Sequence, residues 1–343
     1  MIRKPIIGIV IVSYGHEKYL TNLVKLLRDQ MRAGDQIVVV DNHPSGNSHS
    51  IMSGHKAVDF AIKADNNGFA AGCNEGASKI INLVDILFFV NPDTSPEKNV
   101  IDVIRNADYE KYSAVMPLLL LPNGDVNSAG NTIHISGLSW SSGYGIPTEK
   151  YNKDQDVSAL SGACLAVSKK WWNKLGGIPE SYFLYYEDID FCTQIILRGG
   201  RLCLLPKAKI EHDYDFSKGS HKWVYLERNR PLYILRTWPT SVIVVLFIQL
   251  FLVEIGLWVV AILQKRFKMK IKSFFMTLKA LPIVIKNRHI IQKKRKISGY
   301  EFLLTLSYKL DTPMLGKIGE NKLINTIFMI YYKISLQILK LFR

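Results

Sequence analysis

The sequence is poor in cysteine and lacks the spacing that a cysteine-based site requires. Its four cysteines among 343 residues form no C-x-x-C pair. They are Cys73, Cys164, Cys192 and Cys203. This scatter argues against a disulfide framework and against a zinc site. We therefore expect four reduced, mostly buried thiols in a cytosolic compartment.

Several motifs of other protein classes are also missing. The sequence has no G-x-x-x-x-G-K-S/T phosphate-binding loop, no G-x-S-x-G nucleophile elbow, no internal repeat and no low-complexity tract. Its first residues, "MIRKPIIGIVIVSYGHE", begin with basic residues, but the apolar run is short and lacks a small-residue cleavage site. We expect this run to form a strand and not a signal peptide.

Acidic residues become scarce toward the end of the chain. Residues 1–220 carry 22 Lys and Arg against 24 Asp and Glu, whereas residues 221–343 carry 22 against 5, which gives the net charge of +15. In the second part the basic residues are interleaved with Phe, Leu and Ile at helical spacing. This pattern favours an anionic membrane surface as the partner. We expect no nucleic-acid partner, because the excess of basic residues lies outside the near-neutral part.

The basic part contains a long apolar run. Residues 240–263, "TSVIVVLFIQLFLVEIGLWVVAIL", exceed the about 20 residues that span a bilayer, although Gln249 and Glu254 interrupt the run. Two basic, amphipathic stretches follow it. Lys and Arg flank both ends of the run, so the sequence leaves open whether it spans the bilayer, re-enters or lies on the surface. We expect a globular domain at residues 1–225 and a helical, membrane-associated region at residues 226–343.

The globular part alternates strand and helix signals. Continuous apolar runs such as "IIGIVIVSY", "DQIVVVDN" and "VDILFFVNPD" are typical of strands buried on both faces, and "EKYLTNLVKLLRDQM" has the spacing of an amphipathic helix. This order predicts a doubly wound parallel sheet, in which ligands bind at the carboxyl ends of the strands. Ser13, Asp41 and Asp93 each fall where a predicted strand ends.

After this alternation the pattern loosens. From about Ala114 to Asp156, short strands and turns rich in Gly, Ser and Asn predict a mixed or antiparallel insertion. A further strand and helix lead to "YFLYYEDIDF", in which acidic residues open a helix behind a run of aromatics. Both burial and a neighbouring like charge raise the pKa of a carboxyl group, which is the adjustment that a general base needs.

The ordered motifs resemble those of the family 2 glycosyltransferases, and specifically the bacterial rhamnosyltransferase-like branch. The resemblance covers roughly Ile6 to Ser217 and is carried by "IVIVSY", "IVVVDN", "NNGFAAGCNEG", "FFVNPDT", "SGACLAVSKKWW", "YFLYYEDIDF" and "LPKAKIEHDYDFS". It implies a GT-A fold, that is, a doubly wound mixed α/β sheet with a Rossmann-like nucleotide-binding half and an acceptor half. It also implies a nucleotide-sugar donor, a divalent metal and transfer with inversion.

The resemblance implies a set of residues that bind the nucleotide sugar. They are Ser13, Tyr14, Asp41, Asn67, Gly68, Asn74 and Asn91. The chemistry of these residues is compatible with that role. A carboxylate at a strand end can accept a hydrogen bond from the imide N–H of a base or from a ribose hydroxyl. The glycines of "NNGFAAGCN" let a backbone approach a ligand closely, and the N-terminus of the following helix favours anions.

The same resemblance implies the metal ligands and the catalytic base. Asp93 occupies the last acidic position of the family's D-x-D motif, whose first acid is an amide here, and His212 completes the metal site in some members. A histidine ligand favours Mn²⁺ over Mg²⁺. Asp188 matches the catalytic base, Glu187 is expected to bind an acceptor hydroxyl, and Asp190 to complement the helix dipole.

We therefore expect a glycosyltransferase of cell-surface polysaccharide synthesis, such as that of O-antigen. It would transfer rhamnose or another deoxyhexose from a dTDP- or UDP-sugar to a lipid-linked glycan at the cytoplasmic face of the bacterial inner membrane. The alternatives are a non-catalytic membrane scaffold that keeps a nucleotide-sugar fold, or a sugar nucleotidylyltransferase. The latter is disfavoured because "VSYGHEKYL" has one glycine where that class needs a glycine-rich, basic loop.

Overall fold

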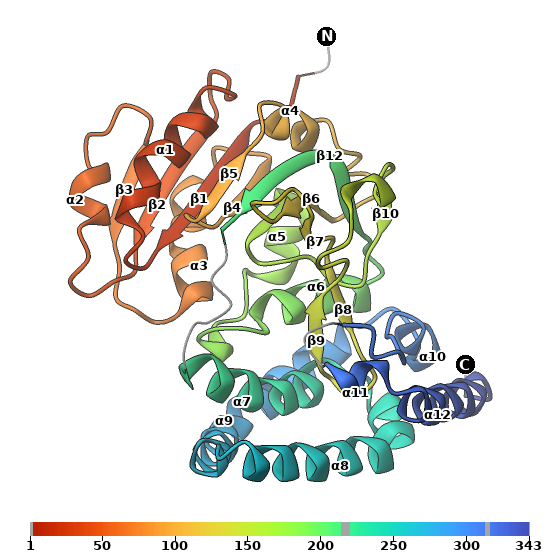
Figure 1. The fold of residues 1–343 in the computed structure, drawn as a ribbon. Coiled ribbons are helices and arrows are strands. Elements are labelled where there is room, and N and C mark those ends of the chain that lie inside the picture. The colour runs from red at the N-terminus through yellow and green to blue at the C-terminus, as the bar shows by residue number, and fades with distance from the viewer. Residues whose placement is uncertain (1–2, 214–219, 313–315, 343) are drawn as a thin grey trace. The chain divides into compact units, whose positions relative to one another are not determined.

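The computed structural model describes residues 3–213, 220–312 and 316–342, and the chain divides into two compact units (Figure 1). The first unit holds the described residues up to 213, apart from residues 131–142 and 196–199. The second unit holds those two short segments and the described residues from 220 onward. The sequence places a domain boundary after residue 225, which falls inside a helix of the second unit. It gives no sign that residues 131–142 belong to that unit.

The first half of the first unit is the predicted parallel sheet. Its strands pair in the order β4-β1-β2-β3, and all three pairings are parallel. They are β1 (Ile7–Ser13), β2 (Gln36–Asp41), β3 (Phe60–Lys63) and β4 (Ile86–Val90). The helices between them are α1 (Glu17–Arg28), α2 (Ser48–Met52) and α3 (Phe69–Ile80). Every residue of β1 and β4 is buried, which explains their continuous apolar sequences.

The second half makes the sheet mixed. Strand β11 runs antiparallel to both β4 and β6, and β12 runs parallel to β6. The strands of this half are β5 (Thr94–Pro96), β6 (Ala114–Leu120), β7 (Val126–Ser128), β10 (Gln155–Asp156), β11 (Cys164–Ser168) and β12 (Leu202–His212). The helices are α4 (Val100–Arg105), η1 (Thr148–Lys150), α5 (Lys169–Leu175), η2 (Glu180–Tyr182) and α6 (Glu187–Leu197). The prediction of a doubly wound mixed sheet is confirmed, and all four cysteines are buried and free.

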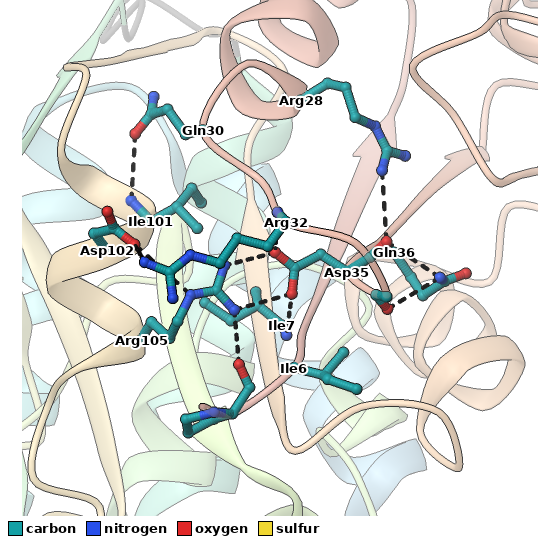
Figure 2. Close-up of polar contacts among 12 residues, drawn as sticks. Ile6, Ile7, Arg28, Gln30, Arg32, Asp35, Gln36, Ile101, Asp102 and Arg105 are labelled. Carbon is teal, nitrogen blue, oxygen red and sulfur yellow. Dashed lines mark hydrogen bonds and ion pairs between the residues drawn. The ribbon is translucent and has the colours of Figure 1, made fainter. Parts of the chain in front are cut away.

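A buried ion pair fastens the edge of the sheet where β1 begins (Figure 2). The Arg105 guanidinium donates to both carboxylate oxygens of Asp35, at 3.0 and 2.6 Å, and to the carbonyl of Pro5. Asp35 also accepts from the backbone N–H groups of Ile7 and Arg32. Burial raises the pKa of Asp35, but these donors and the guanidinium charge outweigh it and hold the pKa below its usual value.

The second unit is helical, with one small hairpin. Its helices are α7 (Ser220–Thr237), α8 (Thr240–Leu263), α9 (Phe267–Lys293), α10 (Gly299–Leu303), α11 (Lys317–Glu320) and α12 (Lys322–Lys340). The hairpin consists of β8 (Asn131–Ile133) and β9 (Ser139–Ser141). Helix α8 coincides with the apolar run at 240–263, and α9 and α12 form from the two basic, amphipathic stretches. By length and composition α8 is a candidate membrane span, and it is the one such helix among the described residues.

Candidate active site

Two neighbouring strands bring Ser13 and Asp41 together at the carboxyl edge of the parallel sheet. These residues are paired in the β1–β2 register, and both are fully buried. The hydroxyl of Ser13 lies 2.8 Å from that of Ser48, at the start of α2. Tyr14 is half exposed, and its ring lies 4.6 Å from that of His43. The predicted base and ribose contacts therefore lie side by side, and the tyrosine ring faces solvent.

The carboxylate of Asp41 shapes the loop that follows it. It accepts hydrogen bonds from the backbone N–H groups of His43 and His49, and from the ammonium of Lys63 at 3.0 Å. Lys63 also donates to the carbonyls of His43 and Gly46. The sequence pattern gave no role to Lys63, because it lies 22 residues from Asp41. Asp41 thus organises the residues around the predicted nucleoside site, and its direct contact with the nucleoside stays a prediction.

Gly68 permits a close approach of two backbone segments. Its φ is +100°, and a Cβ atom there would lie 2.3 Å from the carbonyl oxygen of Phe183. The N–H of Phe69 donates to that carbonyl at 2.9 Å, and the amide of Asn42 donates to the carbonyl of Gly68. Sequence reasoning attributed this glycine to the approach of a ligand; in the structure it is the chain's own backbone that approaches. Asn67 beside it is exposed.

Asn74 also joins parts of the fold. Its side-chain amide donates to the carbonyl of Ile178 and to the carboxylate of Glu180, and it accepts from the N–H of Ile178. Both amide hydrogens are therefore used within the protein. The structure gives Asn74 the task of holding the segment before α6 against α3, which differs from the donor contact that the resemblance implied.

The segment before α6 has a strained backbone. Phe183, Tyr185 and Tyr186 have φ values of 66°, 68° and 72°, which L-residues with large side chains rarely adopt. Such conformations cost about 1–3 kcal/mol each and persist where surrounding contacts fix them. One such contact is the hydrogen bond of 2.5 Å from the Tyr182 hydroxyl to Asp190. Asp190 is fully buried and also accepts from Gln194, so it holds the start of α6, a larger role than the dipole effect predicted for it.

The first turn of α6 presents two adjacent carboxyl groups in unlike surroundings. Asp188 accepts from the N–H groups of Gly162, at 2.9 Å, and Ile189, at 2.8 Å. Burial raises the pKa of Asp188, and these hydrogen bonds oppose the increase. Glu187 is 5% exposed, and its Oε2 has no hydrogen-bond partner among the residues that the structure describes. Burial, followed by the charge of Asp188, raises the pKa of Glu187 to about 8. A general base beside a protonated acid is therefore feasible at neutral pH.

Asp93 and His212 form a second pair of potential ligands. Strand β12 pairs with β5 so that His212 lies opposite Thr94, and the histidine Nε2 is 3.5 Å from Asp93 Oδ1. The other ring nitrogen, Nδ1, lies 3.3 Å from the side-chain oxygen of Asn127, a residue that the motifs did not single out. Both members of the pair are buried, with side chains about 6% exposed.

The spacing of this pair fits a divalent ion. Two adjacent ligands at about 2.1 Å from an octahedral ion are about 3 Å apart, close to the 3.5 Å between Asp93 and His212. The described residues include no group of three or more His, Cys, Asp and Glu side chains placed to hold a metal. An ion here would therefore need further oxygen ligands, which a diphosphate and water can supply.

A short segment links the two carboxylate sites. Asn91, two residues before Asp93, donates from its backbone N–H to the carbonyl of Ala163 at 2.8 Å. Gly162, the residue before Ala163, donates from its backbone N–H to the carboxylate of Asp188 at 2.9 Å. The segment that leads to Asp93 and the carboxylate of Asp188 are therefore both bonded to the same turn before β11. The motif "SGACLAV" contains this turn, but the sequence does not indicate that Gly162 bonds to Asp188, 26 residues away.

The chain is similar in sequence to known proteins. Residues 8–176 match the sequence model of glycosyl transferase family 2. The low-salt glycan biosynthesis hexosyltransferase Agl10 of Haloferax volcanii is 26% identical over 54% of this chain, which spans 60% of that relative. The rhamnosyltransferase WbbL of Escherichia coli K12 is 25% identical over 60% of this chain and 82% of its own length. The N-acetylglucosaminyl-diphospho-decaprenol L-rhamnosyltransferase of Mycobacterium tuberculosis is 21% identical over 62% of this chain and 78% of its own length.

Solved structures share the fold at lower identity. GalNAc-T7, crystallised with UDP, GalNAc and Mn²⁺, is 16% identical over 70% of this chain and 49% of its own, with a TM-score of 0.57. Residues 1–349 of TarS from S. aureus, in complex with UDP-GlcNAc, are 14% identical over 97% of this chain and 90% of their own, with a TM-score of 0.54. These similarities support the predicted GT-A fold.

Proposed function

The chain belongs to glycosyl transferase family 2 through its domain at residues 8–176, in the rhamnosyltransferase-like branch, and we propose that it transfers a deoxyhexose such as rhamnose with inversion of configuration. The donor is a dTDP- or UDP-sugar. The observation that carries the proposal is that two segments meet at the turn before β11. The backbone of Asn91, two residues before Asp93, and the carboxylate of Asp188 are both bonded to this turn, which links a site suited to a diphosphate with a carboxylate suited to a base.

The donor end of the site is the carboxyl edge of β1 and β2. Ser13, Tyr14 and the loop that Asp41 organises offer a hydroxyl, an aromatic ring and backbone groups to a base and ribose. Asn91 lies beside the diphosphate position. Asp93 and His212 would hold a divalent ion, Mn²⁺ or Mg²⁺, which supplies the positive charge that stabilises the departing diphosphate.

Asp188 acts as the general base. Its carboxylate accepts the proton of an acceptor hydroxyl while that oxygen forms a bond to the anomeric carbon and the bond to the nucleoside diphosphate breaks. Attack opposite the leaving group inverts the anomeric centre. The N–H groups of Gly162 and Ile189 fix the carboxylate during the transfer. Glu187, protonated below about pH 8, donates a hydrogen bond to the acceptor from the adjacent position.

The acceptor is a lipid-linked glycan at the cytoplasmic face of the bacterial inner membrane, in the synthesis of a cell-surface polysaccharide. Two features support this assignment. One is the similarity to the mycobacterial L-rhamnosyltransferase whose name gives N-acetylglucosaminyl-diphospho-decaprenol as its acceptor, and the other is the basic, apolar second unit. Binding the surface that carries the acceptor raises the effective concentration of the acceptor.

A nucleotide-release assay with dTDP- and UDP-sugars, with and without Mn²⁺, tests the proposal. We expect Asp188→Asn to lower turnover by about 10²- to 10⁴-fold, the usual contribution of a general base, and to leave nucleotide affinity within about twofold. Asp154→Asn, at an exposed acid of the same unit, is the matched control. Turnover retained by Asp188→Asn would remove the base assignment.

The metal pair is tested through binding. Asp93→Ala and His212→Ala should each abolish the Mn²⁺-dependent part of nucleotide affinity, measured calorimetrically, whereas Asp213→Asn, next to His212, should keep it. Wild-type protein that binds the nucleotide but releases none with any donor would favour the non-catalytic scaffold. Synthesis of the nucleotide sugar from a sugar 1-phosphate would favour the nucleotidylyltransferase.

A further inference from the structure

One face of α8 is an apolar stripe exposed to solvent. Its members recur at the spacing of one helix face and are about half to two thirds exposed. They are Val244, Phe247, Ile248, Phe251, Leu252, Ile255, Val259 and Ile262. The opposite face, with Val242, Leu246, Gln249 and Ala261, is buried within the second unit. Only 17% of the most apolar window of the helix is buried, so the stripe is not part of a core.

One flank of α8 meets a charged cluster. Glu254, near the middle of the helix, forms an ion pair with Arg230 of α7 and another, at 2.8 Å, with Lys270 of α9. Lys270 also pairs with Glu227 of α7. Arg230 and Lys270 are almost fully buried. Glu254, which interrupts the apolar run in the sequence, therefore lies partly exposed at the flank of the stripe, where Arg230 and Lys270 pair with its charge.

Helix α9 is tied to α8 and carries charge along its length. The ring of Trp258 lies 6.0 Å from that of Phe267 and 6.1 Å from that of Phe274. Lys268, Lys272, Lys279 and Lys286 of α9 are exposed. If α8 crossed a bilayer, α9 and the cluster around Glu254 would be carried into the hydrocarbon, where charged groups are strongly disfavoured.

The apolar surface continues on α12. The hydroxyl of Tyr331 donates to the carbonyl of Val245, which joins α12 to α8. Leu323, Ile327, Ile330 and Ile334 form an exposed stripe at helical spacing on α12. Lys265, Arg266, Lys322 and Lys340, at the ends of these two helices, are exposed. Apolar stripes with basic residues at their ends complement a bilayer with anionic headgroups.

We propose that α8 lies in the plane of one leaflet and does not span the membrane, with the stripes of α8 and α12 in the headgroup–acyl boundary. The occupant of this surface is an anionic lipid bilayer. This arrangement puts both basic flanks of α8 on one side, which a single span cannot do. The inference rests on the proposed function only in that a lipid-linked acceptor makes the lipid surface relevant to transfer.

Vesicle binding by the full chain, without donor or acceptor, tests the surface. We expect the protein to bind vesicles of phosphatidylglycerol and phosphatidylethanolamine, and Leu252→Glu to lower the partition coefficient about tenfold or more. Leu83→Glu is the matched control, because Leu83 is 52% exposed against 59% for Leu252, and it belongs to the first unit. Equal vesicle binding by wild type and Leu252→Glu would overturn the proposal. It would also be overturned if the wild-type protein bound no vesicles and formed a dimer that Leu252→Glu dissociates, because the stripe would then be a protein–protein interface.

Labelling with a membrane-impermeant maleimide distinguishes a helix in the plane from a span. The four natural cysteines are buried, so single cysteines introduced by Ser241→Cys and Gln264→Cys report the two ends of α8. Leu83→Cys marks the side of the first unit. In sealed membrane vesicles of either orientation, we expect all three to react from the same side. Reaction of the two ends of α8 from opposite sides would overturn the proposal. Neither experiment measures transfer, so loss of the proposed activity and loss of this topology are separate outcomes.

Discussion

The buried carboxyl of Glu187 makes the stability of the protein depend on pH in a predictable direction. Its pKa is raised from 4.5 to about 8, first by burial and then by the charge of Asp188. A raised carboxyl pKa means that the folded state binds more protons than the unfolded state between these two values. The free energy of unfolding therefore falls as the pH rises from about 4.5 to about 8. Above pH 8 Glu187 is ionised in both the folded and the unfolded state, so it causes no further decrease.

The substitution Glu187→Gln isolates this effect, because an amide has nearly the shape of the protonated acid and does not ionise. One pKa unit corresponds to about 1.4 kcal/mol, so the shift of Glu187 corresponds to at most about 5 kcal/mol. Near pH 4.5 we expect the free energy of unfolding of the variant to equal that of wild type within about 1 kcal/mol. At pH 9 we expect it to be higher than that of wild type by up to about 5 kcal/mol. With a slope of about 3 kcal/mol per molar urea, the unfolding midpoint at pH 9 would rise by roughly 1–2 M.

Urea unfolding of both proteins at pH 5, 7 and 9, followed by tryptophan fluorescence, measures the difference. Glu149→Gln, at an exposed glutamate of the first unit, is the control and should show no gain that grows with pH. In the transfer assay, wild-type kcat/KM should decline above about pH 8, where Glu187 ionises and can no longer donate a hydrogen bond, while Glu187→Gln keeps a donor. A midpoint difference that stays constant from pH 5 to pH 9 would refute the reasoning.

Two further substitutions test the sheet edge and the close approach at Gly68. Arg105→Met leaves Asp35 buried without its cation and should lower the free energy of unfolding by about 3–5 kcal/mol in urea titrations, whereas unchanged stability would show that the ion pair contributes nothing. Gly68→Ala would place a Cβ atom 2.3 Å from the carbonyl of Phe183, so kcat should fall at least about tenfold while nucleotide affinity stays within about threefold. Gly124→Ala is the control, because Gly124 also has a positive φ, +88°, but has no neighbour within 4 Å of a Cβ atom. An equal loss of kcat in both variants would count against the close approach as the cause.

The fold was predictable where hydrophobic periodicity is strong. Strands β1, β2 and β4 are continuous apolar runs, and the apolar positions of α1, Leu20, Leu23, Val24 and Leu27, recur on one face and are all buried. The apolar run at 240–263 corresponds residue for residue to α8. Local pattern does not encode the pairing of segments far apart in the chain. For this reason the assignment of residues 131–142 to the second unit had no signal in the sequence.

The motifs nominate the residues of the candidate site but not the contacts that these residues make. Asp93 and His212 were expected together, and the structure puts them 3.5 Å apart, although 119 positions separate them. The motifs could not show that Lys63 pairs with Asp41, nor that the amide of Asn74 is used by Ile178 and Glu180. A motif reports which side chains are present, whereas their hydrogen-bond partners depend on the tertiary packing.

The position of Asp188 is set from both halves of the sheet. From the parallel half, Gly68 receives the backbone of Phe183 and so fixes the strained segment before α6. From the other half, Gly162 donates to the carboxylate, and a Cβ atom at Gly162 would lie 3.2 Å from that of Asp188. Strain of about 1–3 kcal/mol at each left-handed residue would relax if either contact were lost. The loop of Gly68, the strained segment and Asp188 are therefore expected to behave as one structural unit, so a change at Gly68 should alter turnover although Gly68 does not itself touch the carboxylate.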